Sequence, residues 1–304
     1  MPPNIIGSWT FDPTAAAVLV LVCAVLAPAA RRATVTRAQY GNLGIALVIW
    51  VLATCSAIAV FAPALFWLRA VQVLVLLYVV PFFLALSRPV SVLREGLRPG
   101  GQQRLDAVLT CAPMRLLLSP PVTSVLMLAT PWLLYLTPWY LASMTGAVAA
   151  LTRVLLVVIG FGYFYTRLQV DPVPHRYPPL LSIGISVAEG LGDGILGLVL
   201  WLGPVIAYDY YAGLHRDFGP SIRDDQTYGA GVLWVLGDVL GVPFILLLMR
   251  ALGSDERRKA AEVDAALDAA APPAGAEEVT DDGAEAPSGG LWWQNDPQLR
   301  DRYR

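Results

Sequence analysis

The chain has 304 residues, of which 56% are hydrophobic and only 14% charged, with a mean hydropathy of +0.59 and a formal net charge of −2. This composition excludes an ordinary soluble globular protein, and the small net charge argues against a nucleic-acid partner. The apolar residues fall in runs of about 18 to 25, which is the length that crosses a bilayer as a helix. We therefore predict an all-α, polytopic membrane protein.

Seven apolar windows predict a bundle of seven transmembrane helices. They lie near residues 14–30, 42–62, 66–87, 122–138, 141–166, 180–206 and 228–250. No basic segment precedes the first window, so we interpret it as a span rather than as a cleaved signal peptide. Pro138, followed by Trp139 and Tyr140, predicts a tight turn between the fourth and fifth spans.

Basic residues predict the orientation of this bundle. Arginines cluster in the connections after spans one, three, five and seven, whereas the alternate connections contain only Arg216 and Arg223. Because cytoplasmic loops carry an excess of positive residues, we predict that the N-terminus lies outside and the C-terminus in the cytoplasm.

The composition changes after the bundle, which we assign to residues 1–253. Segment 254–270 has Ser254 as a candidate N-cap and many alanines, so it predicts a short cytoplasmic helix. Residues 271–290 are mostly Ala, Pro, Gly and acidic residues, which is typical of a flexible linker. The terminal tail, 291–304, returns to aromatics and arginine, and it either rests on the membrane surface or serves as a docking peptide.

Five charged residues lie inside predicted spans, namely Arg69, Arg153, Glu189, Asp193 and Asp238. Arg153 falls near the middle of the fifth window, where an unpaired charge costs at least about 2.5 kcal/mol. Glu189 and Asp193 are one helical turn apart and share a helix face. Because intramembrane charges usually face the protein interior and pair, we predict one hydrogen-bonded network. Its role is structural pairing, a pathway for protons, ions or a polar ligand, or the remnant of a metal site.

Small residues surround the two carboxylates of the sixth span. They are Gly190, Gly192, Gly194 and Gly197. Such a stretch predicts that a neighbouring backbone or a long side chain approaches this helix closely.

The last window contains DDQTYGAGVLWVLGDV, and here the sequence resembles the CtaG family of cytochrome c oxidase assembly factors. The matching residues are Asp225, Gln226, Ala230, Gly231, Trp234, Gly237 and Asp238. WTFDP (9–13), the apolar segment 71–89 and GFGYFYTRLQVDP (160–172) add to the resemblance, and the terminal tail is similar to the ending of actinobacterial members. The resemblance implies a multi-pass protein of the bacterial plasma membrane.

The resemblance also implies histidines that handle copper, and here the sequence departs from the family. Members have a His-x-x-Gln-His pattern in span three and further histidines in spans five and six. At those positions this sequence has Arg69, Gln72, Val73, Arg153 and Asp193. A guanidinium group cannot ligate a metal, and the two histidines of the chain, His175 and His215, lie in predicted loops. We therefore predict that the chain binds no copper and carries no other cofactor.

The resemblance, together with the replaced histidines, implies a scaffold or chaperone for cytochrome c oxidase assembly, with terminal oxidase subunits or other assembly factors and membrane lipid as partners. The candidate docking residues are Trp9, Asp12, Trp292 and Trp293. The alternative is a transporter or channel-like protein with an Arg/Asp/Glu pathway, although no inverted repeat is visible. The chain is not predicted to be an enzyme, because it has no nucleophile–base pair, and GLGDG lies inside a span without the strand that a phosphate loop requires.

Overall fold

The computed structural model describes residues 7–169, 171 and 179–270, and every regular element in these ranges is a helix. Six helical segments are long and apolar enough to cross a membrane, namely Pro13–Ala30, Arg37–Phe61, Phe66–Leu86, Gly146–Leu168, Gly184–Leu202 and Ile222–Ala266. The predicted fourth span is the apolar helix Pro120–Leu136, which has 17 residues. The prediction of an all-α fold with several membrane-competent helices is confirmed.

The structure divides these segments into shorter elements, of which η1 and η2 are π-helical turns. In chain order they are α1 (Pro13–Ala30), α2 (Arg37–Cys55), α3 (Ala57–Phe61), α4 (Phe66–Leu74), η1 (Val75–Val79), α5 (Val80–Leu86), α6 (Pro89–Gly96), α7 (Pro99–Thr110), α8 (Ala112–Leu117), α9 (Pro120–Leu136), α10 (Trp139–Ala142), α11 (Gly146–Leu168), α12 (Pro179–Leu202), α13 (Tyr208–Gly213), α14 (Ile222–Gly231), η2 (Val232–Leu236) and α15 (Gly237–Ala270).

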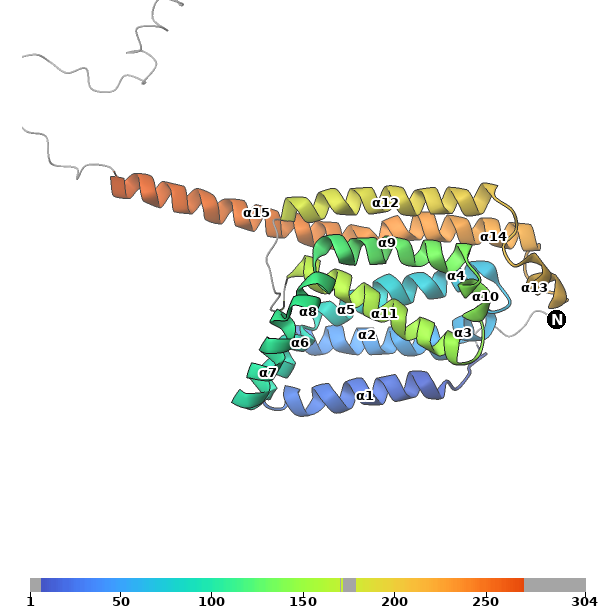
Figure 1. The fold of residues 1–304 in the computed structure, drawn as a ribbon, viewed down its shortest axis with the longest axis horizontal. Coiled ribbons are helices and arrows are strands. Elements are labelled where there is room, and N and C mark those ends of the chain that lie inside the picture. The colour runs from blue at the N-terminus through green and yellow to red at the C-terminus, as the bar shows by residue number, and fades with distance from the viewer. Residues whose placement is uncertain (1–6, 170, 172–178, 271–304) are drawn as a thin grey trace, which may run out of the picture. The chain divides into compact units, whose positions relative to one another are not determined.

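The chain divides into two units between Asp255 and Glu256. In the first unit, the short helices α6, α7 and α8 gather at one end of the bundle, and α3, α10 and α13 gather at the other (Figure 1). We call these the α7 end and the α13 end. In the second unit, Arg258 and Glu262 lie one helical turn apart and form an exposed ion pair of 3.3 Å.

The segment Phe66–Leu86 forms the centre of the bundle. In its apolar window 61% of the residues are buried, compared with 33% or fewer in each of the other spanning segments. It packs against α2, α11 and α14. The outer helices expose many apolar side chains, which is the expected pattern where lipid rather than water is the solvent.

A proline shapes the middle of this central segment. Pro81 has no N–H, so the carbonyl of Leu77 four residues earlier has no helical donor from it. The turn before Pro81 is π-helical, and the Val80 N–H bonds to the carbonyl of Val75. At Gly160 of α11 an added Cβ would lie 2.0 Å from the Leu77 carbonyl oxygen. The two backbones therefore meet at this turn, and only glycine permits the contact.

The connection between the fourth and fifth spans differs from its prediction. Instead of a tight turn, Pro138 precedes the short helix α10, and α11 begins at Gly146. Gly146 has a φ of +66°, which is the left-handed conformation that glycine adopts readily. The fifth span therefore starts five residues later than the predicted start at residue 141.

The connection after the third span and the end of the last span contain further helix. The arginine-rich connection after the third span contains the three helices α6, α7 and α8. Helix α15 continues through Ser254 without a break, so Ser254 is not an N-cap. The predicted linker 271–290 and tail 291–304 lie outside the described residues.

Candidate functional site

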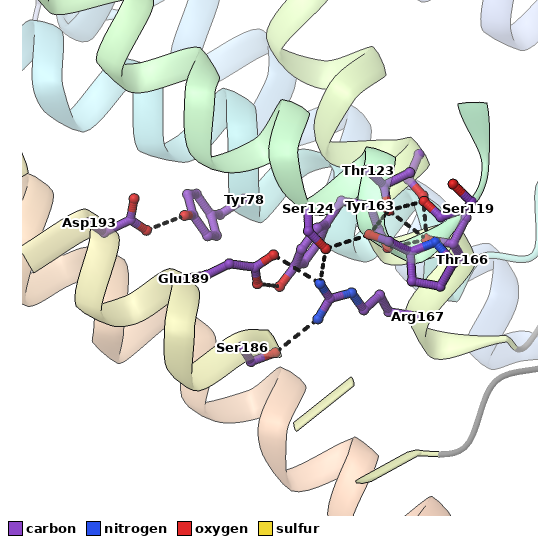
Figure 2. A network of polar contacts seen from close by, with 12 residues as sticks. Tyr78, Ser119, Thr123, Ser124, Tyr163, Thr166, Arg167, Ser186, Glu189 and Asp193 are labelled. Atoms are coloured by element: carbon purple, nitrogen blue, oxygen red, sulfur yellow. Dashed lines mark hydrogen bonds and ion pairs between the residues drawn. The ribbon is translucent and has the colours of Figure 1, made fainter. Parts of the chain in front are cut away.

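A buried ion pair joins α11 and α12 near the α7 end of the bundle. Arg167, in the last turn of α11, is 1% exposed, and its Nη2 atom lies 2.9 Å from Oε1 of Glu189 in α12. The guanidinium group also donates to the hydroxyl groups of Ser124 in α9 and Ser186 in α12 (Figure 2). One side chain thus ties three helices together.

Tyr163 completes the surroundings of this ion pair. Its hydroxyl donates to Oε2 of Glu189 at 2.6 Å, and the guanidinium carbon of Arg167 lies 4.5 Å from the Tyr163 ring centroid. Tyr163 and Arg167 share a face of α11 because they are four residues apart. A buried ion pair is tolerated when further hydrogen bonds satisfy its remaining atoms, and hydroxyl groups supply those bonds here.

Asp193 lies one turn after Glu189 on the same face of α12. Its Oδ2 atom accepts a hydrogen bond of 2.7 Å from the hydroxyl of Tyr78 (Figure 2). Tyr78 lies in the π-helical turn η1, so the irregular turn before Pro81 places this hydroxyl group. Short π-helical turns are frequent at functional sites in other proteins.

Asp238, at the start of α15, is the third carboxylate of this region. It is exposed at the surface of the bundle rather than buried as the sequence predicted. An added Cβ on Gly190 would lie 3.3 Å from Oδ1 of Asp238, so a small residue lets α15 approach α12. Glu189, Asp193 and Asp238 line one cavity of about 70 Å³ together with Tyr78 and aromatic residues of α11 and α15. We call it the carboxylate cavity, and its groups can hold protons or hydrogen-bond donors.

Arg69 and Gln72 form a second polar group in the central helix. The Arg69 Nη1 atom donates to Oε1 of Gln72 at 2.7 Å, and Nη2 donates to the Ser143 hydroxyl at 2.7 Å. Gln72 in turn donates to the carbonyl of Ala53 at 2.8 Å. Arg69 is 3% exposed, and no carboxylate of the described residues lies within ion-pair distance of it.

Three tyrosines, Tyr135, Tyr140 and Tyr211, lie close to the Arg69 group. Tyr140 and Tyr211 share a hydrogen bond of 2.6 Å between their hydroxyl groups, and Phe66 and Tyr135 pack against Tyr140 with ring centroids 5.6 and 5.3 Å away. The hydrogen-bond acceptors of the Arg69 guanidinium group are uncharged, namely the Gln72 amide oxygen and the hydroxyl and carbonyl groups of Ser143.

Arg153 pairs with the start of α1. Its guanidinium group contacts Asp12, which also accepts hydrogen bonds from the backbone of Thr14 and Ala15 as the N-cap of the helix. Because α11 begins at Gly146, Arg153 is about 10 Å from the start of its helix. Arg153 therefore lies closer to the start of its helix than the window 141–166 predicted, and it lies beside the start of α1.

The predicted single network is divided among separate places in the structure. Its members were Arg69, Arg153, Glu189, Asp193 and Asp238. The structure brings the last three to the carboxylate cavity, while the two arginines have other partners. Pairing depends on helix ends and helix rotation, which the hydropathy windows do not specify.

Asp225 and Gln226 connect α14 to two other parts of the bundle. The Asp225 carboxylate accepts the N–H groups of Phe66 and Trp67 at 3.0 Å each, and it forms an ion pair of 2.8 Å with Arg216. It caps α4, whose own N-cap residue has no side-chain acceptor. Gln226 accepts the N–H of Ile206, and it donates to the carbonyl of Leu200 in the last turn of α12 and to that of Pro204 after the helix.

Trp234 of the resemblance packs α14 and η2 against α12. An added Cβ on Gly197 would lie 2.8 Å from the Trp234 Cβ, and one on Gly194 would lie 3.1 Å from its ring nitrogen. Gly231, another residue of the resemblance, has open space around its Cβ position. In this region the glycines of α12 therefore form a packing surface.

Asp171, in the segment after α11, caps α6 in a similar way. Its carboxylate oxygens accept the N–H groups of Val90 at 3.2 Å and Ser91 at 3.0 Å. Burial raises the pKa of Asp171 above its ordinary value, and the hydrogen bonds from Ser91 and Val90 offset only part of that rise. Acidic side chains from distant parts of the sequence thus cap the N-termini of α4 and α6.

Sequence reasoning missed the roles of Arg167 and Arg216, because it assigned both to loops. Each is the buried cationic partner of a carboxylate, with 0% and 7% of its side chain exposed. The spacing of Tyr163 and Arg167, one turn apart beside an apolar run, was the available signal for the first. No comparable signal marked Arg216.

At the positions where the resemblance implies histidines, most side chains of this chain are not metal ligands. The described residues contain no group of three His, Cys, Asp or Glu side chains placed to hold a metal ion. Where the resemblance implies histidines, Arg69 offers donors only, and Gln72 already bonds Arg69 and a backbone carbonyl. His215 is exposed at the α13 end, and His175 lies outside the described residues.

Comparisons with known proteins find mycobacterial relatives of part of this chain. Uncharacterized proteins Mb0105 of Mycobacterium bovis and MT0111 of Mycobacterium tuberculosis are each 24% identical over 218 residues, which is 69% of this chain and 33% of theirs. Uncharacterized protein ML1998 of Mycobacterium leprae is 24% identical over 223 residues, covering 70% of this chain and 34% of its own. The chain thus spans about a third of the length of these curated relatives.

No solved structure matches the chain. The model of the Caa3_CtaG family, described as cytochrome c oxidase caa3 assembly factor, matches residues 18–253. This range covers most of the chain, including α14 with Asp225 and Gln226. The chain therefore belongs to the Caa3_CtaG family of cytochrome c oxidase caa3 assembly factors.

Proposed function

We propose that the protein is an integral membrane scaffold or chaperone for cytochrome c oxidase assembly, and that it does not itself bind copper. Family membership over residues 18–253 carries the assembly role. The chemistry of the interior supports the second part of the proposal. A guanidinium group at Arg69 repels cations and has no lone pair to offer a metal.

The interhelical bonds support a scaffold role. Three aspartates cap the N-termini of helices, namely Asp12, Asp171 and Asp225. Their carboxylates accept hydrogen bonds from backbone N–H groups or form ion pairs. Polar side chains that are used in this way hold helices in place and leave few groups for chemistry. The family description names an assembly factor and not an enzyme class, and we infer that the chain has no catalytic activity.

Exposed aromatic residues at the start of α1 offer a surface for partner subunits. Trp9 is 59% exposed and Phe11 is 80% exposed, beside Asp12, which is occupied by Arg153. We propose that Trp9 contacts a partner subunit and that the ion pair of Asp12 with Arg153 holds the adjoining start of α1 in place. We also propose that Trp292 and Trp293, in the terminal tail, bind a partner subunit and so tether it to the protein.

We further propose seven spans across the bacterial plasma membrane, with the N-terminus outside. The 17 residues of α9 measure about 26 Å, close to the roughly 30 Å hydrocarbon core. Arg216 and Arg223 are the two arginines on the side that we predict to be outside. Both have partners in the protein, because Arg216 pairs with Asp225 and Arg223 donates to carbonyls at the end of α12. A membrane-impermeant maleimide tests the orientation.

In intact cells Cys111, exposed at the α7 end, should resist the reagent, and it should react after permeabilisation. In a Cys111→Ser background, His215→Cys at the α13 end should react in intact cells. The opposite labelling pattern would reverse the orientation.

A polar pathway across the membrane is not favoured. Between Gln72 and Tyr78 the central helix presents Val73, Leu74, Leu76 and Leu77, all buried. The step of six residues from Gln72 to Tyr78 rises about 9 Å along the helix, and apolar side chains therefore separate the Arg69 group from the carboxylate cavity.

Three measurements test the proposed function. The purified full chain should capture oxidase subunits from its native membrane and contain no stoichiometric copper by elemental mass spectrometry. Deletion of the gene should reduce the haem signal of the oxidase. One tightly bound copper ion per chain would refute the metal-free role, and an unaffected oxidase in copper-limited cells would refute the assembly role.

A further inference from the structure

Helix α1 is attached to the bundle at its two ends. At the α13 end, Asp12 contacts Arg153, and the Trp50 ring nitrogen donates to the carbonyl of Ala15 at 3.1 Å. At the α7 end, α1 packs directly against α6. An added Cβ on Gly96 would lie 2.4 Å from the Ala29 Cα atom, so two backbones touch there.

Between these attachments an apolar slot separates α1 from the bundle. A cavity of about 210 Å³ lies between α1, α2, α5 and α11, and its lining surface is entirely apolar. A second cavity of about 140 Å³ continues along α1 toward Ala30. Val22 lines both cavities, so they meet at this residue. We call the two together the α1 slot.

The length of the α1 slot matches one leaflet of a bilayer. It follows α1 from Val18 to Ala30, which is about 18 Å of helix. Half of the hydrocarbon core is about 15 Å. An apolar cavity of this kind does not hold water, and the surrounding medium is acyl chain. The slot therefore has the polarity and the length of one lipid tail.

Free positive charge lies where the slot ends. Arg31 and Arg32 directly follow Ala30, both are exposed, and neither has an ion pair among the described residues. One carboxylate is close, since Glu95 accepts the N–H of Thr34. Guanidinium groups bind phosphate oxygens in a bidentate manner, and anionic headgroups attract basic residues near the membrane surface.

We propose that an anionic phospholipid inserts one acyl chain into the α1 slot and that Arg31 and Arg32 bind its phosphate. The lipid fills the space between the two attachments of α1. It also completes the contact of α1 with α2 and α11, where the protein leaves its own side chains apart.

Native mass spectrometry of the full chain in detergent tests this proposal. Phosphatidylglycerol and phosphatidylcholine with the same acyl chains are added at equal concentration. Wild-type protein should retain one phosphatidylglycerol, with an occupancy at least several-fold above that of phosphatidylcholine. Val22→Trp fills the slot at its junction and should reduce the occupancy several-fold. Val20→Trp is the matched control, because Val20 is 66% exposed on α1, and it should bind as wild type does.

A second variant keeps the test decisive if Val22→Trp does not fold. Arg31→Gln/Arg32→Gln changes two exposed residues only, and it should remove the preference for phosphatidylglycerol. The proposal is overturned if wild type binds the two lipids equally, if Val22→Trp binds as wild type does, or if the double Gln variant keeps the preference.

Discussion

Replacing Arg167 by methionine should destabilise the bundle strongly. The change removes the 2.9 Å bond to Glu189 and the donors to Ser124 and Ser186. Glu189 is 9% exposed and would keep the Tyr163 hydroxyl as its hydrogen-bond donor. Removing one partner of a buried ion pair typically costs about 3–5 kcal/mol, because the other charge stays buried. We expect a loss of that size in the free energy of unfolding.

The double variant Arg167→Met/Glu189→Leu should recover most of this loss. An apolar pair of similar volume removes the buried charge altogether, and such replacements are often neutral or stabilising. The two substitutions should therefore be strongly non-additive, with a coupling energy of about 3 kcal/mol or more, at least as large as the loss that the double variant recovers. Glu189→Gln alone should lie between wild type and Arg167→Met, because the amide still accepts the Tyr163 hydroxyl.

Unfolding in mixed micelles, titrated with a denaturing detergent and followed by fluorescence, measures these differences. Arg94→Met is the matched control, because Arg94 also pairs with a carboxylate, Asp106, but both side chains are exposed. Exposed ion pairs contribute little to stability, so this variant should unfold like wild type. The reasoning fails if Arg167→Met is as stable as wild type, or if the two substitutions of the double variant are additive.

Three further changes test the contacts of α14, α12 and α1. Asp225→Ala should lower the unfolding free energy by at least about 1 kcal/mol, because it removes the cap of α4. Gly197→Ala should cost about 1–3 kcal/mol, since its Cβ would meet the Trp234 Cβ at 2.8 Å, whereas Gly231→Ala should be neutral. Burial raises the pKa of Asp12, but its hydrogen bonds at the start of α1 and the nearby guanidinium group outweigh burial, so the pKa is lowered. The stability it contributes is therefore present above its ordinary pKa and should disappear as the pH falls through the lowered value.

The same unfolding assay decides each of these cases. Asp225→Asn retains an acceptor and should lose less than Asp225→Ala, so equal losses would contradict the capping role. Equal effects of alanine at Gly197 and Gly231 would contradict close packing at the first. For Asp12, the stability difference between wild type and Asp12→Asn should shrink in acid, and a difference independent of pH would contradict the assigned ionisation.

Much of the membrane architecture could be read from the printed residues. Long apolar runs predict helices because a backbone in lipid must satisfy its own hydrogen bonds. The motif in the last span indicated the family, which the match over residues 18–253 confirms. Glu189 and Asp193 were correctly expected to share one helix face, because a spacing of four residues is a property of the helix itself.

The partners of the charged residues required the folded structure. Arg153 pairs with Asp12 because α11 begins at Gly146, and Arg167 enters the bundle because α11 extends to Leu168. Hydropathy locates a span only to within a few residues, yet one residue turns a helix face by 100°. Ion pairs need a nitrogen and an oxygen atom within about 4 Å of each other, and that distance depends on the rotation and the ends of two helices at once.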